Sequence, residues 1–452
     1  MHFSNNHYKI ECLGCHAVFY DGDPFLLNCT ENHRDCLLRA TYNDKTFSTI
    51  NSFAGFFRYA RWLPVQRILK NAPQPIIYRS TGLASLLGLE NLFILFNGYW
   101  PEKNAWIETC SFKELEAYSV CARAPKNFNG TFVMSSVGNS AKGFIKACSE
   151  NDIPAIIVVP KSVLHNIWLP QQVNPLVKLV VLDGDSDYED AMHVSFKLSK
   201  NEGFIKVGGS RNIAKRDALG TSLLYAVEFL GKMPHHYFQA VGSGAGAIGV
   251  WEMSKRLRKD GRFGHKKTKL HLSQSQEFQL MVDAWQKQEP RLPKIDQKES
   301  KRKKIKRMRA AVLGNLKPIY SVKGGIFDAL KDTSGYMYKA SREAAEKSGF
   351  LFEKIEGAGV GTAAEVAIAS LFQAVERKHV RKDDIVVLNI TDGGPKRMKR
   401  ENKIHQCQPD LLVDFEMVED EEVDSYILDN LFGKDSHETG YKTYREDSTA
   451  HK

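Results

Sequence analysis

The sequence lacks long apolar segments. None of its 452 residues belongs to a run of eighteen or more apolar residues, so no transmembrane helix is predicted. The first residues, Met1 to Asn6, lack the apolar core of a secretion signal. No internal repeat is present either. These absences lead us to expect a cytoplasmic protein.

Acidic residues are the scarcer charge, with 53 Asp and Glu against 63 Lys and Arg, which gives a formal net charge of +10. Much of the excess lies in one run, Lys301–Arg309. A charge run is usually a solvated face, so we expect no nucleic-acid partner. At 42% hydrophobic and 26% charged residues, the composition is that of a soluble globular protein long enough for at least two cores.

Cysteine is also scarce, and four of the eight cysteines crowd near the start of the chain. Cys12 and Cys15 form a C-x-x-C knuckle, and Cys29 with Cys36 or His33 could complete a tetrahedral zinc site. The second pair is loosely spaced, so a zinc ribbon that has lost its ion is the alternative. A disulfide framework is not expected in a reducing cytosol. The candidate ligands are Cys12, Cys15, Cys29 and Cys36.

Short apolar runs alternate with helix-like segments, which predicts an α/β fold. The runs are continuous, as expected for parallel strands that are buried on both faces. Most of them meet Gly, Pro, Asn or Asp within a few residues, which favours strands followed by loops at a ligand-binding edge. They are Leu92–Phe96, Gly130–Met134, Ala155–Val159, Leu179–Leu182 and Ile385–Ile390.

The segments between these strands are less regular. Phe53–Trp62 is aromatic and helical in pattern, whereas Arg256–Arg309 is polar and basic and is predicted to be a mostly exposed excursion. The sheet is expected to resume near Val312. After Pro409 the chain is acidic, and it is predicted to pack as a final small element before fraying from about His437.

A lysine motif occurs in Thr109–Ala117, where Ser111 and Phe112 precede Lys113. A lysine beside a serine and an aromatic residue is, by itself, typical of a solvated side chain. Its interpretation therefore depends on three motifs that follow it along the chain.

The first of these is Ser135–Ala141, which follows a predicted strand and precedes a predicted helix. Its side chains and amides would therefore face a ligand at the carboxyl end of the strand. The alternative is that Asn139 simply occupies a turn, as asparagine after glycine often does.

The second is the glycine-rich loop Gly242–Gly249, which follows the predicted strand Tyr237–Val241 and leads into a helix. Small residues let backbone amides close on an anion, and the helix aims its positive end at the same place. A dinucleotide-binding loop is the alternative. The acidic residue expected about twenty positions later is not clear, because the sequence there becomes basic.

The third is Asn389–Gly394, which closes the last predicted strand. Thr391 at this strand end is either a ligand-binding residue or part of an ordinary turn. Only the complete ordered set of four motifs makes the ordinary interpretation improbable.

In this order the motifs resemble those of the threonine synthase-like enzymes, which belong to the fold-type II pyridoxal-phosphate family. The resemblance implies that Lys113 carries pyridoxal 5'-phosphate and that Asn139 hydrogen-bonds the phenolic oxygen of its ring. It further implies that Thr391 meets the pyridine nitrogen. A neutral hydroxyl at that nitrogen makes the ring a weaker electron sink, which suits elimination and replacement better than transamination. The loop that would hold the phosphate comprises Gly242, Ser243, Gly244, Ala245 and Gly246.

The implied fold is the α/β fold of the tryptophan synthase beta type, with two open twisted sheets flanked by helices. A small zinc-ribbon-like segment is expected at residues 1–45. A large cofactor-binding domain is expected from residues 46–125 and 226–452, and a small mobile domain from residues 126–225. A homo-oligomer is expected by analogy with this fold type.

Longer stretches resemble one branch of this family, the cysteate synthases. They are Tyr78–Ala84, Phe96–Glu102, Gly209–Asp217, His236–Gly244 and Asp260–Gly264. The implied reaction joins O-phospho-L-serine and sulfite to give L-cysteate and phosphate, a step toward coenzyme M in some methanogens. Threonine synthase activity on O-phosphohomoserine and a catalytically silent binding protein are the alternatives.

The implied substrates carry anionic groups, which require cationic or amide-rich surroundings because burying an unpaired anion is costly. Basic side chains near the motifs are therefore candidates for binding them. The candidates are Arg79, Lys142, Arg211, Lys215 and Arg216.

Overall fold

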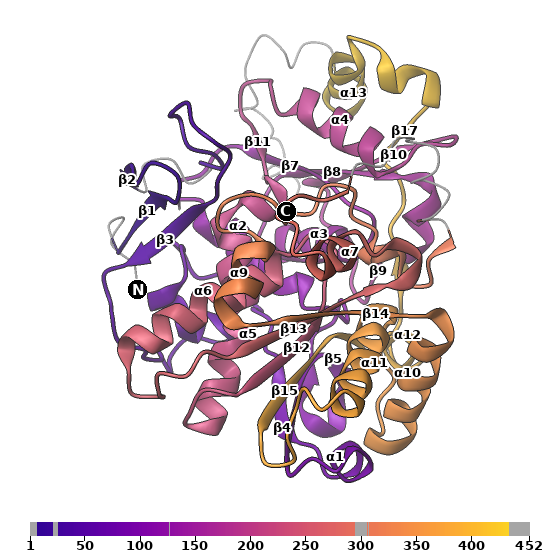
Figure 1. The fold of residues 1–452 in the computed structure, drawn as a ribbon. Helices are drawn as coiled ribbons and strands as arrows, with labels where there is room; N and C mark the ends of the chain where they lie inside the picture. Colours follow the sequence, from indigo (N-terminus) through magenta and orange to yellow (C-terminus); the bar gives the residue numbers. More distant parts are fainter. Residues whose placement is uncertain (1–6, 21–25, 126, 294–304, 306, 434–452) are drawn as a thin grey trace.

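The computed structural model describes residues 7–20, 26–125, 127–293, 305 and 307–433. The first element is a three-stranded antiparallel sheet with the order β2-β1-β3 (Figure 1). Its strands are β1 (Tyr8–Cys12), β2 (Val18–Tyr20) and β3 (Leu38–Tyr42). Residues alternate between buried and more exposed positions along β1 and β3, as expected for a sheet that packs on one face. A 3-10 helix, Gly55–Trp62, follows and buries its aromatic side chains.

The largest sheet has seven strands, ordered β14-β13-β12-β15-β5-β4, with β6 paired to β5. The five strands from β14 to β5 are parallel, whereas β4 and β6 run antiparallel to β5. The strands are β4 (Ile76–Arg79), β5 (Asn91–Trp100), β6 (Ala105–Trp106), β12 (His236–Ala240), β13 (Lys269–Ser275), β14 (Tyr336–Ala340) and β15 (Ile385–Gly393).

Helices cover both faces of this sheet, which explains its continuous apolar strands. Side chains of α11 share one core with Ile94, Phe238 and Leu388, whereas α5 and α6 share another core with Leu95, Tyr237 and Val387. The helices are α1 (Gly82–Leu87), α5 (Ile213–Leu230), α6 (Ala245–Asp260), α7 (Leu280–Gln286), α9 (Ile326–Thr333), α10 (Arg342–Glu356), α11 (Thr362–Glu376) and α12 (Pro395–Glu401).

A second sheet has five parallel strands with the order β11-β7-β8-β10-β17. Helices α2 and α3 lie on one side of it, and α4 and α13 lie on the other, at the top of Figure 1. The elements are α2 (Lys113–Arg123), β7 (Thr131–Ser135), α3 (Asn139–Glu150), β8 (Ala155–Pro160), β10 (Val177–Leu182), α4 (Tyr188–Leu198), β11 (Phe204–Lys206), β17 (Leu411–Val413) and α13 (Val423–Phe432). Short strands β9 (Trp168–Leu169) and β16 (His405–Gln406) form a separate pair.

The tail differs from the predicted division of the chain, which placed residues 226–452 in the larger domain. Strand β17 pairs with β10, and Val423, Ile427 and Leu428 of α13 join the core of the five-stranded sheet. The acidic segment does form a final small element, but its apolar residues complete the smaller sheet.

The segment Arg256–Arg309 also differs from the predicted exposed excursion, because it contains β13, a buried interior strand of the large sheet. The sheet does not resume at Val312, which lies in a short 3-10 turn; its next strand is β14. Within the basic run, Lys301–Lys304 and Lys306 lie outside the described residues. Arg309 forms ion pairs with Glu365 and Glu346.

Within the described part of the chain, no helix combines the length and apolar character needed to cross a membrane. The predicted α/β fold with two sheets flanked by helices is confirmed. The carboxyl ends of β12 and β15 in one sheet and of β7 and β11 in the other contribute to one cavity, as expected for ligand sites in parallel sheets.

Candidate active site

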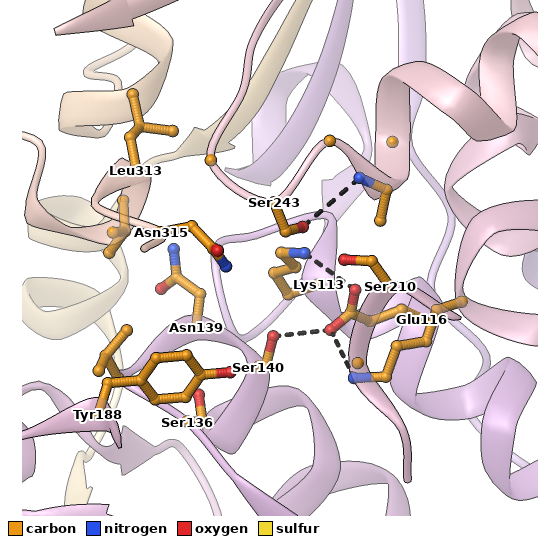
Figure 2. Close-up of a pocket in the computed structure, with 18 of the residues that line it drawn as sticks. Lys113, Glu116, Ser136, Asn139, Ser140, Tyr188, Ser210, Ser243, Leu313 and Asn315 are labelled. Atoms are coloured by element: carbon orange, nitrogen blue, oxygen red, sulfur yellow. Dashed lines mark hydrogen bonds and ion pairs between the residues drawn. The ribbon is translucent and has the colours of Figure 1, made fainter. Parts of the chain in front are cut away.

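A cavity of about 410 Å³ is lined by the four predicted motifs. Figure 2 shows Lys113 among side chains from several elements, including Asn139 and Ser243. Residues far apart in the sequence meet here because strand ends from both sheets face the cavity. The predicted cofactor residues that line it are Lys113, Asn139, Gly242, Ser243, Gly244, Ala245, Gly246 and Thr391.

Lys113 is the first residue of α2, and the loop before it is tied to the last strand of the large sheet. The Phe112 amide donates to the Thr391 carbonyl at 2.9 Å, and Ser111 forms an isolated bridge with Asp392. These backbone contacts fix the start of α2 beside the end of β15. The lysine and the terminal threonine are therefore neighbours although 278 positions of sequence separate their motifs.

A buried carboxylate, Glu116, lies one turn after the lysine. The Lys113 ammonium donates to it at 2.9 Å, Ser140 donates at 2.7 Å, and Lys215 Nζ lies 3.5 Å away (Figure 2). Burial acts to raise the pKa of Glu116, but the charges of Lys113 and Lys215 outweigh it and lower the pKa to about 2. Glu116 thus connects the lysine to α3 and α5. The sequence analysis missed it, although its spacing of three from Lys113 was a usable signal.

The asparagine motif forms the turn between β7 and α3. Gly138 has a φ of 139°, and Ser136 Oγ accepts hydrogen bonds from the amides of Gly138 and Ala141 at 3.2 and 3.0 Å. Asn139 is the first residue of α3 and lines the cavity. The first amides of a helix have no intrahelical acceptor, so this end of α3 is suited to an anion.

The glycine-rich loop lies between β12 and the first turn of α6. Gly244 has a φ of 92°, and a Cβ there would lie 2.7 Å from Ile326 Cγ1. A Cβ at Gly246 would lie 2.6 Å from Gln239 Nε2. Glycine is therefore required both for the turn and for the close packing around it. The loop and the first amides of the 16-residue helix form a cradle for a phosphate-sized anion.

At the end of β15, Thr391 and Asp392 both line the cavity. Asp392 Oδ1 accepts from the Ala364 amide at 3.0 Å, at the start of α11. Burial raises the pKa of Asp392 to about 6. The hydroxyl of Thr391 lies 3.4 Å from Asp392 Oδ1, so this wall offers a neutral hydroxyl beside a carboxyl group that titrates near neutrality.

Only some of the predicted anion-binding residues lie at the cavity. Arg79, Lys142 and Arg216 do not line the cavity. Arg79 donates to the carbonyl of Glu90 on the far edge of the sheet, Lys142 donates to that of Thr109, and Arg216 is buried beside Glu252. Each of these cations binds a backbone carbonyl or a carboxylate of the protein itself, as buried or paired cations usually do.

Arg211 and Lys215 do line the cavity, but each already has a carboxylate partner. Lys317, which also lines it, lies 3.7 Å from Glu189. Among the described basic residues around the cavity, Lys206 at the end of β11 is the one without an ion pair. Partial burial lowers the pKa of Lys206. The sequence analysis missed it because the strand that ends there has only three residues.

The predicted metal ligands lie together at the N-terminal sheet. Ligand atoms of Cys12, Cys15, Cys29 and His33 are all within 4.8 Å of one another. Cys36 was predicted as the fourth ligand, with His33 as its alternative. Its Sγ lies 3.2 Å from that of Cys12, but it is not part of this group of four.

Comparisons with known proteins show the family of the chain. Residues 77–392 match the model of the pyridoxal-phosphate dependent enzyme family. The chain is 42% identical over 403 residues to the cysteate synthase of Methanosarcina barkeri, covering 89% of this chain and 95% of that protein. It is 39% identical to the cysteate synthase of Methanocella paludicola, covering 90% and 94%. The chain belongs to the cysteate synthase branch of the pyridoxal-phosphate dependent enzymes.

Solved structures agree at the level of the fold. Maize serine racemase aligns with a TM-score of 0.54 at 12% identity, covering 72% of this chain and 90% of that one. Threonine deaminase isoform 2 from Solanum lycopersicum aligns with a TM-score of 0.52 at 17% identity, covering 72% and 86%. This likeness concerns the fold alone.

The cavity of this cysteate synthase family member fits pyridoxal phosphate. The glycine cradle that a Cβ would fill accommodates a phosphate, and a lysine that can bind the aldehyde covalently lies in the same cavity. The protein is a pyridoxal-phosphate dependent enzyme.

Proposed function

We propose that this protein catalyses β-replacement of phosphate in O-phospho-L-serine by sulfite, giving L-cysteate and phosphate. One observation carries the proposal: the cavity gathers the lysine, asparagine, glycine and threonine motifs in a chain similar to cysteate synthases over almost its whole length. In the reaction the Cβ–O bond to phosphate breaks and a Cβ–S bond to sulfite forms.

The cofactor is held, in this proposal, by Lys113 covalently and by the Gly242–Gly246 loop through its phosphate. Asn139 would hydrogen-bond the phenolic oxygen of the bound cofactor, and Thr391 would contact its pyridine nitrogen. When bound, pyridoxal phosphate supplies an electron sink for charge that develops at Cα. The neutral Thr391 hydroxyl limits that sink, which suits loss and replacement of a group at Cβ.

Lys113 also moves the proton. In this proposal the Lys113 side chain would remove the Cα proton of the substrate as a general base, and it would return a proton to Cα after the Cβ–S bond has formed. Glu116, which accepts from Lys113 at 2.9 Å, holds the side chain near Cα in the intervening steps. Lys215 and Ser140 keep Glu116 ionised and in place.

The anionic groups of the substrates are divided between two places. The Ser136–Ser140 turn at the start of α3 binds the substrate carboxylate through the amides of Asn139 and Ser140 and through the Ser136 hydroxyl. Lys206, which has no carboxylate partner among the described residues, pairs with the departing phosphate and with the incoming sulfite. A single unpaired cation suits two anions that occupy the site in succession.

The test is an assay of the purified protein with O-phospho-L-serine, with and without sulfite, in which phosphate and L-cysteate are measured. Cysteate formed in step with phosphate is the expected result. Threonine formed from O-phosphohomoserine, with no cysteate from phosphoserine, would instead assign threonine synthase activity. Phosphate release without cysteate would disprove sulfite as the nucleophile.

A separate measurement addresses a silent binding protein. The active enzyme should show a visible absorbance band that borohydride abolishes, with the reduced adduct mapping to Lys113 by mass spectrometry. Absence of the band, with salt-sensitive binding of nucleic acid, would favour the silent protein. The predicted homo-oligomer also stays a prediction, which sedimentation of the same sample would test.

A further inference from the structure

The N-terminal sheet carries a cluster of sulfur and imidazole ligands that the reaction does not use. Cys12 Sγ lies 3.3 Å from His33 Nε2, and Cys15 Sγ lies 3.6 Å from Cys29 Sγ. With bonds of about 2.0–2.3 Å to zinc, tetrahedral ligand atoms lie about 3.5–3.8 Å apart. The four ligand atoms here lie within 4.8 Å of one another, so shifts of about 1 Å or less would place all four around one ion. We propose that Cys12, Cys15, Cys29 and His33 bind a structural zinc ion.

The turn between Cys12 and Cys15 is built for such a site. The Gly14 amide donates to Cys12 Sγ at 3.3 Å, a bond that stabilises a thiolate. A Cβ at Gly14 would lie 2.6 Å from His33 Cε1 and 2.9 Å from Cys36 Sγ. Only glycine therefore lets the loop that carries the second pair of ligands close over the first.

The orientation of His33 points to the same conclusion. Its Nδ1 lies 2.8 Å from the carbonyl oxygen of Arg34, an acceptor only, so Nδ1 carries the proton. The lone pair of Nε2 is then directed at the cysteine cluster. A second hydrogen bond that fixes the tautomer in this way is typical of histidines that bind metals.

Cys36 is the competing fourth ligand. It is buried, and its Sγ lies 3.2 Å from Cys12 Sγ, so it is placed to donate a hydrogen bond to the Cys12 thiolate. Because the close group of four contains His33 and not Cys36, the structure favours a site with three thiolates and one imidazole.

The zinc loop also supports the wall of the active site. Asn28 and Asp35, which flank the ligands Cys29 and His33, accept from Arg211 at 3.0 and 2.8 Å. Arg211 lines the cavity. A metal that fixes this loop therefore fixes the position of a cavity residue.

The loop is also joined to the phosphate cradle through the backbone. The Leu37 amide donates to the Lys323 carbonyl at 3.0 Å, and the nearby Ile319 amide donates to the Ser243 carbonyl at 3.1 Å. Loss of the metal should therefore weaken the cavity as well as the N-terminal sheet.

The first experiment measures zinc by elemental analysis in the full-length protein, produced with zinc in the medium. We expect about one zinc per chain in the wild type and in the control Cys407→Ala, which changes a cysteine outside the cluster. Cys29→Ser and His33→Asn should retain less than about a fifth of that zinc, and Cys36→Ser should retain nearly all of it. A zinc-free wild type would overturn the proposal. Loss of zinc from Cys36→Ser but not from His33→Asn would overturn the assignment of His33.

A second experiment does not depend on whether the variants fold. Cobalt exchanged into the wild-type protein should give the strong charge-transfer and d–d bands of tetrahedral thiolate coordination. Removal of zinc by a chelator should lower the melting temperature, and added zinc should restore it. Weak octahedral cobalt bands, or a Cys15–Cys29 disulfide found by mass spectrometry in the reduced cytosolic preparation, would contradict the proposal. These readouts are independent of catalysis, so they stand apart from the test of sulfite and phosphoserine.

Discussion

The two walls of the cavity differ in charge and in how they are built. Among the described residues, the wall at the ends of β12 and β15 consists of glycines, small side chains, the amide side chain of Gln239 and one carboxyl group, Asp392. The opposite wall, from β11, the short 3-10 helix Gly209–Arg211 and α5, carries Lys206, Arg211 and Lys215. The first wall suits a ring and a phosphate held by backbone amides, whereas the second suits charged substrates. In the proposed function, the first wall holds the phosphate and the pyridine nitrogen of the cofactor, whereas the second wall binds the substrate anions and adds Asn139 to the cofactor site.

Lys113 lies where the walls meet, and its loss should have the largest effect. Lys113→Ala removes both the covalent attachment and the base, so kcat/KM for cysteate formation should fall by at least about 10³-fold. Steady-state assay with saturating cofactor measures this. Lys331→Ala, on an exposed position of α9, is the control. Activity of the Lys113 variant above about a tenth of the wild type would disprove the role of the lysine.

That the first wall, called the cofactor wall below, lines the cavity could be predicted from sequence, because each of its parts is a contiguous motif at a strand end. Gly242–Gly246 and Thr391 need only the strand before them to be recognised. The substrate wall could not be predicted in this way. Whether a cation is free depends on its partner, and the partners of Arg211 and Lys215 come from Asp35 and Glu116, far away in the sequence.

Strand β13 shows a similar limit within the fold. Its sequence contains Lys269, His271 and Gln274. These polar residues predict an exposed segment, yet the strand lies in the interior of the large sheet. The polar groups are satisfied by tertiary partners: His271 bonds His236 and Tyr338, and Gln274 accepts from the Met281 amide. Periodicity cannot reveal such partners, because they come from other strands and from the following helix.

Asp392 tests how unfavourable a negative charge is in the cofactor wall. Its folded pKa of about 6 lies above its ordinary value of 3.8, so the folded protein holds the proton more tightly than the unfolded chain. This contribution to stability is complete below about pH 4 and is lost as pH rises through about 6, amounting to about 3 kcal/mol. Asp392→Asn should remove that loss, so its advantage over the wild type in urea unfolding should grow from pH 4 to pH 7. An advantage independent of pH would contradict the raised pKa.

A substitution of Gly244 tests whether the glycine-rich loop of the same wall can accept a side chain. Gly244→Ala places a Cβ at a φ of 92° and 2.7 Å from Ile326 Cγ1. The free energy of unfolding of Gly244→Ala should be about 2 kcal/mol lower than that of Gly231→Ala, the matched control, because the control has backbone strain but no overpacking. Gly231 has a φ of 67° but nothing within 4 Å of its added Cβ. Urea unfolding gives both costs, and absorbance titration should show weaker cofactor binding only in the Gly244 variant. Equal costs would mean that the cradle tolerates a side chain.

A substitution of Lys206 tests whether the second, positively charged wall binds the substrate, and its expected effect is smaller than those above. Lys206→Met keeps the apolar stem but removes the ammonium, so KM for phosphoserine should rise about 10-fold, the size expected for one charge-assisted hydrogen bond. Lys200→Met is the matched control, because the ammonium groups of Lys200 and Lys206 lie 4.9 and 4.7 Å from the same Phe196 ring, yet Lys200 does not line the cavity. If both variants raise KM equally, the effect comes from the overall positive potential of the surface and not from a direct contact between Lys206 and the substrate phosphate. If only Lys206→Met raises KM, the result supports the view that a basic residue in this cavity binds the substrate anion when it has no carboxylate partner within the protein. Arg211 and Lys215, nearer to motifs but already paired, would then serve to shape the wall.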